Sequence, residues 1–269
     1  MYVANTNRYD NTIYNRCGRS GLVLPRISLG MWQNFGKNAD YDTMKDIILT
    51  AFDHGITYFD LANNYGPDPG QAEINFGKIF NENLKPYRDE IIIATKAGYE
   101  MWPGPYGGRG GSRKYLTASL DQSLKRMGID YVDIFYHHCL DPDTPLKETA
   151  LCMSDIVRQG KSLYIGMSNY DGKKMHRMYH KCDDYNVPFV VNQNRYNILD
   201  RQVEYNSLKK ECFSKHKGLV AFSPLAQGRL SDKFKNGIPE SSRLYGKPDY
   251  CKSIGLDDAQ LQYISSLCE

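Results

Sequence analysis

Short apolar segments alternate with longer amphipathic segments along this chain, from about residue 27 onward. Each apolar segment is rich in β-branched and aromatic residues, which is typical of strands. Strands that alternate with helices of about 10–15 residues predict βαβ units and a parallel sheet. The predicted strands are ISLGM (27–31), TYFDLA (57–62), EIIIATK (90–96), YVDIFYHH (131–138), SLYIGMSN (162–169), FVVNQN (189–194) and GLVAFSPL (218–225).

The amphipathic segments between these strands are predicted to be helices. They span residues 42–54, 70–83, 113–127, 145–159, 173–185 and 202–216. Asp42 is a candidate N-cap of the first helix, and Gly128 and Gly160 are candidate C-terminal signals of two others. Because no G-x-G-x-x-G motif follows the first strand, the pattern argues against a Rossmann layout. We therefore predict an α/β fold, a (β/α)8 TIM barrel with an N-terminal β-hairpin.

The predicted barrel is incomplete at its C-terminal end. About seven β/α units are present, and the chain stops at LDDAQLQYISSLCE, which reads as the start of another helix. An open sheet leaves two unpaired strand edges, which natural proteins avoid. We interpret residues 1–269 as a single barrel domain that is C-terminally truncated, with its last strand and helix missing.

A hairpin pattern precedes the first strand of the barrel. The segment TIYNRCGRSGLVLPR contains two short strand-like stretches around a turn near Gly18–Gly21. We expect the hairpin at residues 11–26 to plug the bottom of the barrel.

Composition excludes several classes of partner. The net charge of +3 and the dispersed basic residues argue against nucleic acid. No apolar run approaches the length of about 18 residues that a membrane span needs, and the first residues lack the apolar core of a signal peptide. Seven scattered cysteines without a C-x-x-C motif are typical of reduced thiols. We therefore expect a cytoplasmic protein with no membrane partner.

Four polar side chains lie at the ends of three predicted strands. They are Asp60, Tyr65, Lys96 and His138. Ligands bind at the carboxyl ends of parallel strands, so an acid, a phenol, an amine and an imidazole there indicate acid–base chemistry around the tyrosine. A single acid or lysine at a strand end is more often structural, and Tyr65 before Gly66 is also compatible with an ordinary turn aromatic.

Several sequence strings carry a family resemblance. DLANNYG, ATKAG, YVDIFYHH, GMSNY and FSPLAQGRL resemble the aldo-keto reductases. The longer strings LANNYGPDPGQAE, KAGYEMWPGPYG, GGSRKYLTASLDQSLKRMG and YNILDRQV resemble one branch of that family. That branch holds the bacterial L-glyceraldehyde 3-phosphate reductases and the voltage-gated potassium channel β subunits. The resemblance covers the whole chain and implies a TIM barrel that binds NADPH without a Rossmann fingerprint.

The resemblance implies a catalytic tetrad, and the chemistry of carbonyl reduction gives each member a role. Tyr65 would donate the proton, and a neighbouring Lys96 ammonium would lower the pKa of that phenol toward useful acid strength. Asp60 would hold Lys96 charged and oriented, and His138 would donate to the substrate oxygen. His138 is preferred over His137 because it shares the inward face of its strand. No metal is required.

The resemblance also implies a set of cofactor-binding residues, which includes Asp60. Hydroxyl and amide groups would bind the nicotinamide carboxamide, an aromatic ring would stack on the nicotinamide, and a turn after the seventh strand would offer N–H groups to the pyrophosphate. Trp32 would form the pocket wall, Ser168, Asn169 and Gln193 would bind the carboxamide, and Tyr196 would stack on the ring. The turn contains Ser223, Leu225 and Gly228, and a loop with Lys233 and Arg243 would cover the phosphates. A buried structural amide is the alternative for Gln193, and a solvated surface charge is the alternative for Lys233 and Arg243. The part of the family that binds the adenosine 2′-phosphate lies beyond the last strand, so NADPH rather than NADH rests on the resemblance alone.

Two weaker patterns occur in the same sequence. The segment GPYGGRGGSRK (104–114) lacks the G-x-x-x-x-G-K-[ST] pattern, so we expect a substrate loop in which Arg109 or Arg113 meets a phosphorylated substrate. His176 and His180 are four residues apart, but Arg177 replaces the glutamate of H-E-x-x-H. An exposed helix face is therefore favoured over a zinc site.

The function predicted from the sequence is NADPH-dependent reduction of small aldehydes or ketones. L-Glyceraldehyde 3-phosphate and methylglyoxal are the leading substrates that the resemblance implies. The alternative is an NADPH-binding regulatory subunit that resembles the potassium channel β subunits and has little turnover. We expect the enzyme, because no long inactivating peptide precedes the hairpin. The expected partner is a small carbonyl substrate, and the sequence leaves homo-oligomerisation open.

Overall fold

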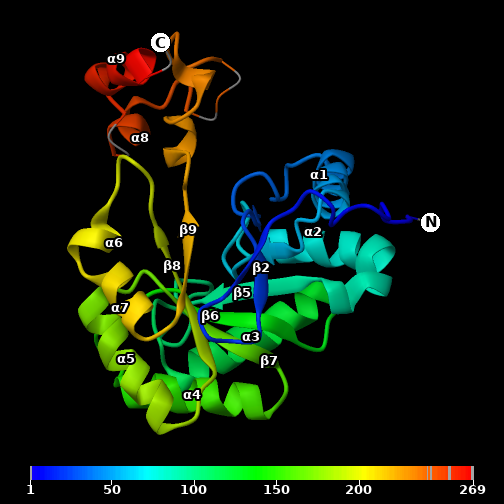
Figure 1. The fold of residues 1–269 in the computed structure, drawn as a ribbon, viewed down its shortest axis with the longest axis vertical. Coiled ribbons are helices and arrows are strands. Elements are labelled where there is room, and N and C mark those ends of the chain that lie inside the picture. The colour runs from blue at the N-terminus through cyan, green and yellow to red at the C-terminus, as the bar shows by residue number, and fades with distance from the viewer. Residues whose placement is uncertain (1, 241, 243, 254–255, 268–269) are drawn as a thin grey trace. The chain divides into compact units, whose positions relative to one another are not determined.

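The computed structural model describes residues 2–240, 242, 244–253 and 256–267 (Figure 1). The chain divides into two compact units. The first consists of Met1–Asn194 and Val203–Val220, and the second of Arg195–Gln202 and Ala221–Glu269. That the whole chain forms one barrel domain stays a prediction.

Seven strands form one sheet in which spatial order follows chain order. The pairs from the first to the sixth of these strands are parallel. This arrangement confirms the predicted series of β/α units, and no eighth strand joins the sheet within the described part of the chain. The strands are β3 (Leu29–Gly30), β4 (Tyr58–Asp60), β5 (Ile92–Ala97), β6 (Val132–His137), β7 (Ser162–Ser168), β8 (Phe189–Arg195) and β9 (Gly218–Phe222).

Helices connect consecutive strands, as predicted (Figure 1). They are α1 (Tyr41–Asp53), α2 (Gln71–Ile79), α3 (Arg113–Met127), α4 (Leu146–Arg158), α5 (Gly172–Asp184), α6 (Gln202–Tyr205) and α7 (Leu208–Ser214). A π-helical turn (Phe80–Leu84) and a 3₁₀ segment (Lys85–Glu90) extend α2. The single helix predicted for 202–216 is divided, because Ser207 adopts a left-handed backbone with φ of 65°.

The predicted N-cap of the first helix is wrong by two residues. Asp40, rather than Asp42, has the extended backbone of a cap, and its carboxylate accepts a 2.8 Å hydrogen bond from the Thr43 N–H. Asp42 lies inside the first turn of α1. The C-terminal signal Gly128 is confirmed, since it is left-handed and its N–H bonds to the Leu124 carbonyl.

The predicted N-terminal hairpin is confirmed. Strands β1 (Tyr14–Arg16) and β2 (Val23–Pro25) pair in antiparallel register. Its buried side chains pack on apolar residues of β4, β5, β6 and β8. The cluster comprises Cys17, Leu22 and Leu24 of the hairpin with Tyr58, Ala94, Ile134, Tyr136, Val190 and Val191 of the sheet.

The second unit has a small core of its own. Buried side chains of Phe234, Leu244, Cys251 and Leu256 form it. Two helices, α8 (Pro248–Ser253) and α9 (Asp258–Leu267), belong to this unit. No helix in the described part of the chain is long and apolar enough to cross a membrane.

Packing of the hairpin on the sheet predicts a large cost for Leu24→Ala. Leu24 is buried, so its truncation leaves a cavity and should lower the free energy of unfolding by roughly 2–5 kcal/mol. Val23 is 44% exposed on the same strand, and Val23→Ala should stay within about 0.5 kcal/mol. Urea unfolding followed by circular dichroism measures both, and equal costs would contradict the packing.

Candidate active site

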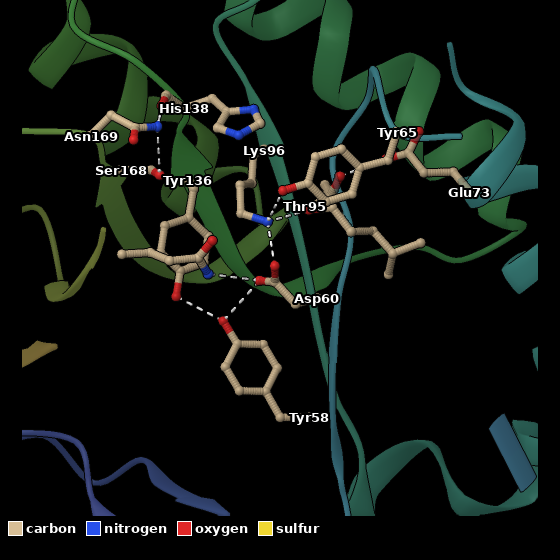
Figure 2. Close-up of polar contacts among 12 residues, drawn as sticks. Tyr58, Asp60, Tyr65, Glu73, Thr95, Lys96, Tyr136, His138, Ser168 and Asn169 are labelled. Carbon is tan, nitrogen blue, oxygen red and sulfur yellow. Dashed lines mark hydrogen bonds and ion pairs between the residues drawn. The ribbon is translucent and has the colours of Figure 1, made fainter. Parts of the chain in front are cut away.

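The structure brings the four predicted tetrad residues together at the carboxyl ends of neighbouring strands (Figure 2). Asp60 is the last residue of β4, Lys96 lies near the end of β5, and His138 directly follows β6. Tyr65 lies in the turn after β4. The side chains of Asp60, Lys96 and His138 are buried, and Lys96 is fully buried.

The Lys96 ammonium is the centre of this group. Its Nζ donates to Asp60 Oδ2 at 2.5 Å, to the Leu61 carbonyl at 2.7 Å and to the Tyr65 hydroxyl at 3.4 Å. Each of its three protons therefore has an oxygen partner. The His138 ring lies edge-on to the Tyr65 ring, with the two ring centroids 5.8 Å apart.

Strand register explains why these side chains converge. Successive side chains of a strand point to opposite faces. Lys96 therefore shares a face with Ala94, which packs in the hairpin cluster, and His138 shares a face with Tyr136. His137 faces the other way, where its Nδ1 lies 2.7 Å from the Tyr170 hydroxyl. The geometry agrees with the preference for His138.

Burial and the Lys96 charge set the protonation states. Burial alone would lower the pKa of Lys96, but the attraction of Asp60 and Tyr65 raises it above its usual value. Burial raises the pKa of Tyr65 above 10.0, and the Lys96 charge offsets this only in part. Burial, together with the Lys96 charge, holds the pKa of His138 well below 6.5. At neutral pH the lysine is charged, whereas the tyrosine and the histidine are neutral.

One expectation about the tyrosine is therefore wrong. Lys96 was expected to lower the pKa of Tyr65 overall, and its charge does act in that direction. The loss of water around the buried phenol is the larger effect, because desolvation disfavours the phenolate.

A second layer of polar groups lies beneath Asp60. Its Oδ1 accepts hydrogen bonds from the Tyr58 hydroxyl at 3.3 Å and from Gln193 Nε2 at 3.0 Å. The Tyr58 and Tyr136 hydroxyls lie 2.7 Å apart, and both rings are fully buried (Figure 2). These tyrosines were not singled out from the sequence. The available signal was their position two residues before Asp60 and His138, on the same strand faces.

The opposite face of β5 is held by a buried ion pair. Glu73 of α2 is fully buried, accepts from Thr95 Oγ1 at 2.5 Å and pairs with Arg126 Nε of α3 at 2.7 Å. Because Thr95 precedes Lys96, this network fixes the strand segment that carries the lysine (Figure 2).

The predicted cofactor residues of the first unit lie beside the tetrad. Asn169 has a left-handed backbone, and its Nδ2 donates to the His138 carbonyl at 2.9 Å and to Ser168 Oγ at 3.2 Å. Trp32 is 45% exposed, and its ring lies 6.5 Å from the Tyr65 ring. The Gln193 contact with Asp60 matches its alternative as a structural amide. Hydroxyl and amide groups at the ends of β7 and β8 are the donors and acceptors that a nicotinamide carboxamide needs, so these residues fit such a group.

The other predicted cofactor residues belong to the second unit. The Tyr196 N–H donates to the Phe222 carbonyl at 3.4 Å. Ser223 begins a tight turn, since its carbonyl accepts from the Ala226 N–H at 2.9 Å. The turn includes Leu225 and Gly228, Lys233 is exposed, and Arg243 lies outside the described residues. The roles of these residues stay predictions.

No metal-binding site is visible among the described residues. No group of three or more His, Cys, Asp or Glu side chains there is placed to hold a metal ion. His176 and His180 contact each other, and His176 Nδ1 lies 3.0 Å from Glu211.

Comparison with known proteins identifies the family. The model of the aldo/keto reductase family matches residues 26–248. This chain belongs to the aldo/keto reductase family. The L-glyceraldehyde 3-phosphate reductase of Escherichia coli (strain K12) is 51% identical to this reductase over 245 residues, which cover 91% of this chain and 70% of the relative. A probable voltage-gated potassium channel subunit beta of Arabidopsis thaliana is 35% identical over 235 residues, which cover 86% and 69%.

A solved structure supports the fold of this aldo-keto reductase. The crystal structure of a thermostable aldo-keto reductase in complex with the inhibitor epalrestat superimposes with a TM-score of 0.70 at 29% identity, covering 95% of this chain and 99% of that one. The predicted TIM-barrel class is thus confirmed, as is the enzyme class, an oxidoreductase that acts on carbonyl groups. Enzymes of this family use nicotinamide cofactors.

The Tyr58–Tyr136 contact predicts non-additive stability changes. Tyr58→Phe leaves the buried Tyr136 hydroxyl without this partner, so the free energy of unfolding should fall by roughly 1–3 kcal/mol. Replacing both tyrosines by phenylalanine should cost less than the sum of the single changes, because no hydroxyl is then orphaned. Urea unfolding of the two single variants and the double variant measures this, and additive costs would contradict the contact.

Proposed function

We propose that this aldo-keto reductase reduces small aldehydes or ketones with NADPH, with Tyr65 as the proton donor. L-Glyceraldehyde 3-phosphate and methylglyoxal are the candidate substrates. The observation that carries the proposal is the position of the Lys96 ammonium, 2.5 Å from Asp60 and 3.4 Å from the Tyr65 hydroxyl. The reductase relative at 51% identity supports the substrate class.

Tyr65 is in the protonation state that a proton donor needs. Its pKa above 10.0 keeps the phenol protonated at neutral pH. When the proton passes to the substrate oxygen, the resulting phenolate faces the Lys96 ammonium, which stabilises it. Asp60 keeps that ammonium charged although it is fully buried.

His138 orients the carbonyl. It is neutral, so one of its ring nitrogens carries a proton that it can donate. The Tyr65 and His138 ring centroids are 5.8 Å apart, so the two rings are close enough for both to contact the oxygen of one substrate. Two donors on one oxygen stabilise the negative charge that develops there during reduction.

A nicotinamide cofactor, when bound, supplies the hydride for the carbonyl carbon. In the first unit, Ser168, Asn169 and Gln193 would bind its carboxamide, and Trp32 would wall the pocket. For the rest of the cofactor, the family resemblance implies a stacking ring, a turn that offers N–H groups and a loop with cationic side chains. Those residues are Tyr196, then Ser223, Leu225 and Gly228, and then Lys233 and Arg243. NADPH rather than NADH, and a cytoplasmic location, are parts of this proposal.

Two observations bear on the cellular setting. Six cysteines in the described part of the chain are free thiols, which supports a reducing compartment. Identity to the Escherichia coli reductase exceeds identity to the channel subunit, which supports turnover over a regulatory role. A homo-oligomer remains compatible with these features.

Removal of the Tyr65 hydroxyl tests the proposed proton donor. Tyr65→Phe should lower kcat for aldehyde reduction at least about 100-fold, because the general acid is lost. NADPH absorbance measures turnover, and cofactor binding should be retained. Tyr205→Phe is the matched control, since Tyr205 is 76% exposed on α6. Unchanged kcat in Tyr65→Phe would refute the mechanism.

The pKa shifts predict the pH profile of reduction. The protonated phenol is the active form, so kcat should be constant from pH 6 to near 10 and fall about tenfold per unit above the Tyr65 pKa. No inflection is expected near 6.5, because the pKa of His138 lies well below that value. Steady-state rates across this range measure the profile, with circular dichroism as a check on folding. A decline centred near pH 8 would contradict these protonation states.

A further inference from the structure

We propose that Arg109 binds the phosphate group of a phosphorylated aldehyde substrate and so determines substrate specificity. This inference rests on the proposed reductase function and names a residue outside the tetrad. It assigns a ligand to the glycine-rich loop between β5 and α3, which the proton chemistry does not use.

The first observation is the place of the Arg109 guanidinium. Its Cζ lies 5.6 Å from the centroid of the Tyr99 ring. The Tyr99 ring in turn lies edge-on to the His138 ring, with centroids 4.7 Å apart. A single aromatic ring therefore separates the guanidinium from the histidine that faces the carbonyl oxygen.

These distances suit a three-carbon phosphorylated aldehyde. Four bonds of about 1.5 Å join its carbonyl carbon to phosphorus, which gives a span of about 5 Å in the extended molecule. A guanidinium N–H reaches a phosphate oxygen at about 2.8 Å, often through two parallel bonds. With its carbonyl oxygen on Tyr65 and His138, such a substrate extends across Tyr99 to Arg109.

The second observation is that Arg109, which hydrogen-bonds the Cys139 thiol, has no carboxylate in direct contact among the described residues. Arg109 is exposed, and it forms no ion pair within 4.0 Å with a carboxylate of the described residues. The thiol beside it, Cys139, is kept neutral because burial raises its pKa, and its Sγ donates to the Gly98 carbonyl at 3.1 Å. An exposed guanidinium without a carboxylate in direct contact is suited to an anionic ligand.

The carboxylate that acts on the Arg109 charge makes its hydrogen bonds within the loop. Asp141 Oδ2 accepts from the Gly111 N–H at 2.9 Å and from Thr144 Oγ1 at 2.5 Å, and its Oδ1 accepts from the Asp143 N–H at 3.0 Å. Asp141 therefore organises the loop, and its charge attracts the Arg109 guanidinium without forming an ion pair with it within 4.0 Å.

The third observation is the way the loop is fixed. The Gly110 N–H donates to the Gly98 carbonyl at 3.0 Å, which closes the loop directly behind Arg109. A Cβ at Gly110 would lie 2.7 Å from Asp141 Oδ2, and one at Gly111 would lie 2.9 Å from the His137 ring. The glycines thus permit the close packing that holds Arg109 in place, which reduces the entropy lost when a ligand binds.

The structure also separates Arg109 from the other cations of this segment. The Arg113 guanidinium pairs with Asp155 of α4 at 2.5 Å, on the helical side of the sheet. The Lys114 ammonium lies over the Tyr106 ring at 5.1 Å. Of the two arginines that the sequence left open, Arg109 is the one beside the site.

A matched pair of substrates tests the proposal. L-Glyceraldehyde 3-phosphate and L-glyceraldehyde differ only in the phosphate, and wild type should prefer the phosphorylated compound. Arg109→Gln should lower kcat/KM for that compound roughly 10–100-fold, mainly through KM, and should leave kcat/KM for glyceraldehyde unchanged. Arg113→Gln, the control, should change neither value. Equal effects of Arg109→Gln on both substrates, or no preference in wild type, would overturn the proposal.

A binding measurement distinguishes failure of the site from failure of the reaction. Glycerol 3-phosphate is the alcohol product and cannot be reduced further, so calorimetric titration with it in the presence of NADPH reports the phosphate site without turnover. Wild type should bind it roughly 10–100-fold more tightly than Arg109→Gln does. If no carbonyl compound is reduced, the proposed function fails. If turnover occurs but glycerol 3-phosphate binds both proteins equally, the phosphate site alone is refuted.

Discussion

A lysine with no exposed surface is the constraint on which the rest of this site depends. An ammonium in the interior of a protein loses its hydration and stays charged only when oxygens replace the lost water. Lys96 has three such oxygens, and the Asp60 carboxylate is the charged one. The parallel pairing of β4 with β5 is what brings them within 2.5 Å. The register of these two adjacent strands therefore decides whether Lys96 stays protonated.

Two groups of side chains support the Asp60–Lys96 ion pair from different sides. Below it, the Tyr58 and Tyr136 hydroxyls separate the carboxylate from the apolar cluster that the hairpin closes. Behind it, Glu73 and Arg126 hold the outer face of β5. A polar group that is fixed before the substrate arrives needs little reorganisation during proton transfer, which is how electrostatic catalysis gains its effect.

The sequence was sufficient for the strand series, the hairpin and the four residues at the strand ends, because period-two patterns are local and consecutive β/α units usually lie side by side. It was not sufficient for details that dihedral angles or burial decide. Asp40 and Asp42 are equally good caps by composition, and only the extended backbone at Asp40 selects it. Ser207 divides a helix without the glycine or proline that would have signalled it. The direction of the Tyr65 pKa shift depends on how much water the folded chain removes, and the pairing of the two tyrosines depends on contacts across strands.

Closure of the loop behind Arg109 has a consequence for how substrate range can change. The bonds that fix the loop run to the Gly98 carbonyl and to Asp141, and neither group belongs to the ion pair around Lys96. Tyr99 contacts His138, but residues 100–109 are separable from the proton-transfer machinery in energetic terms. Substitutions there can accumulate and redirect the enzyme to other carbonyl compounds while the buried charges stay satisfied. Such a division lets one barrel scaffold diversify its substrates at little risk to its folding.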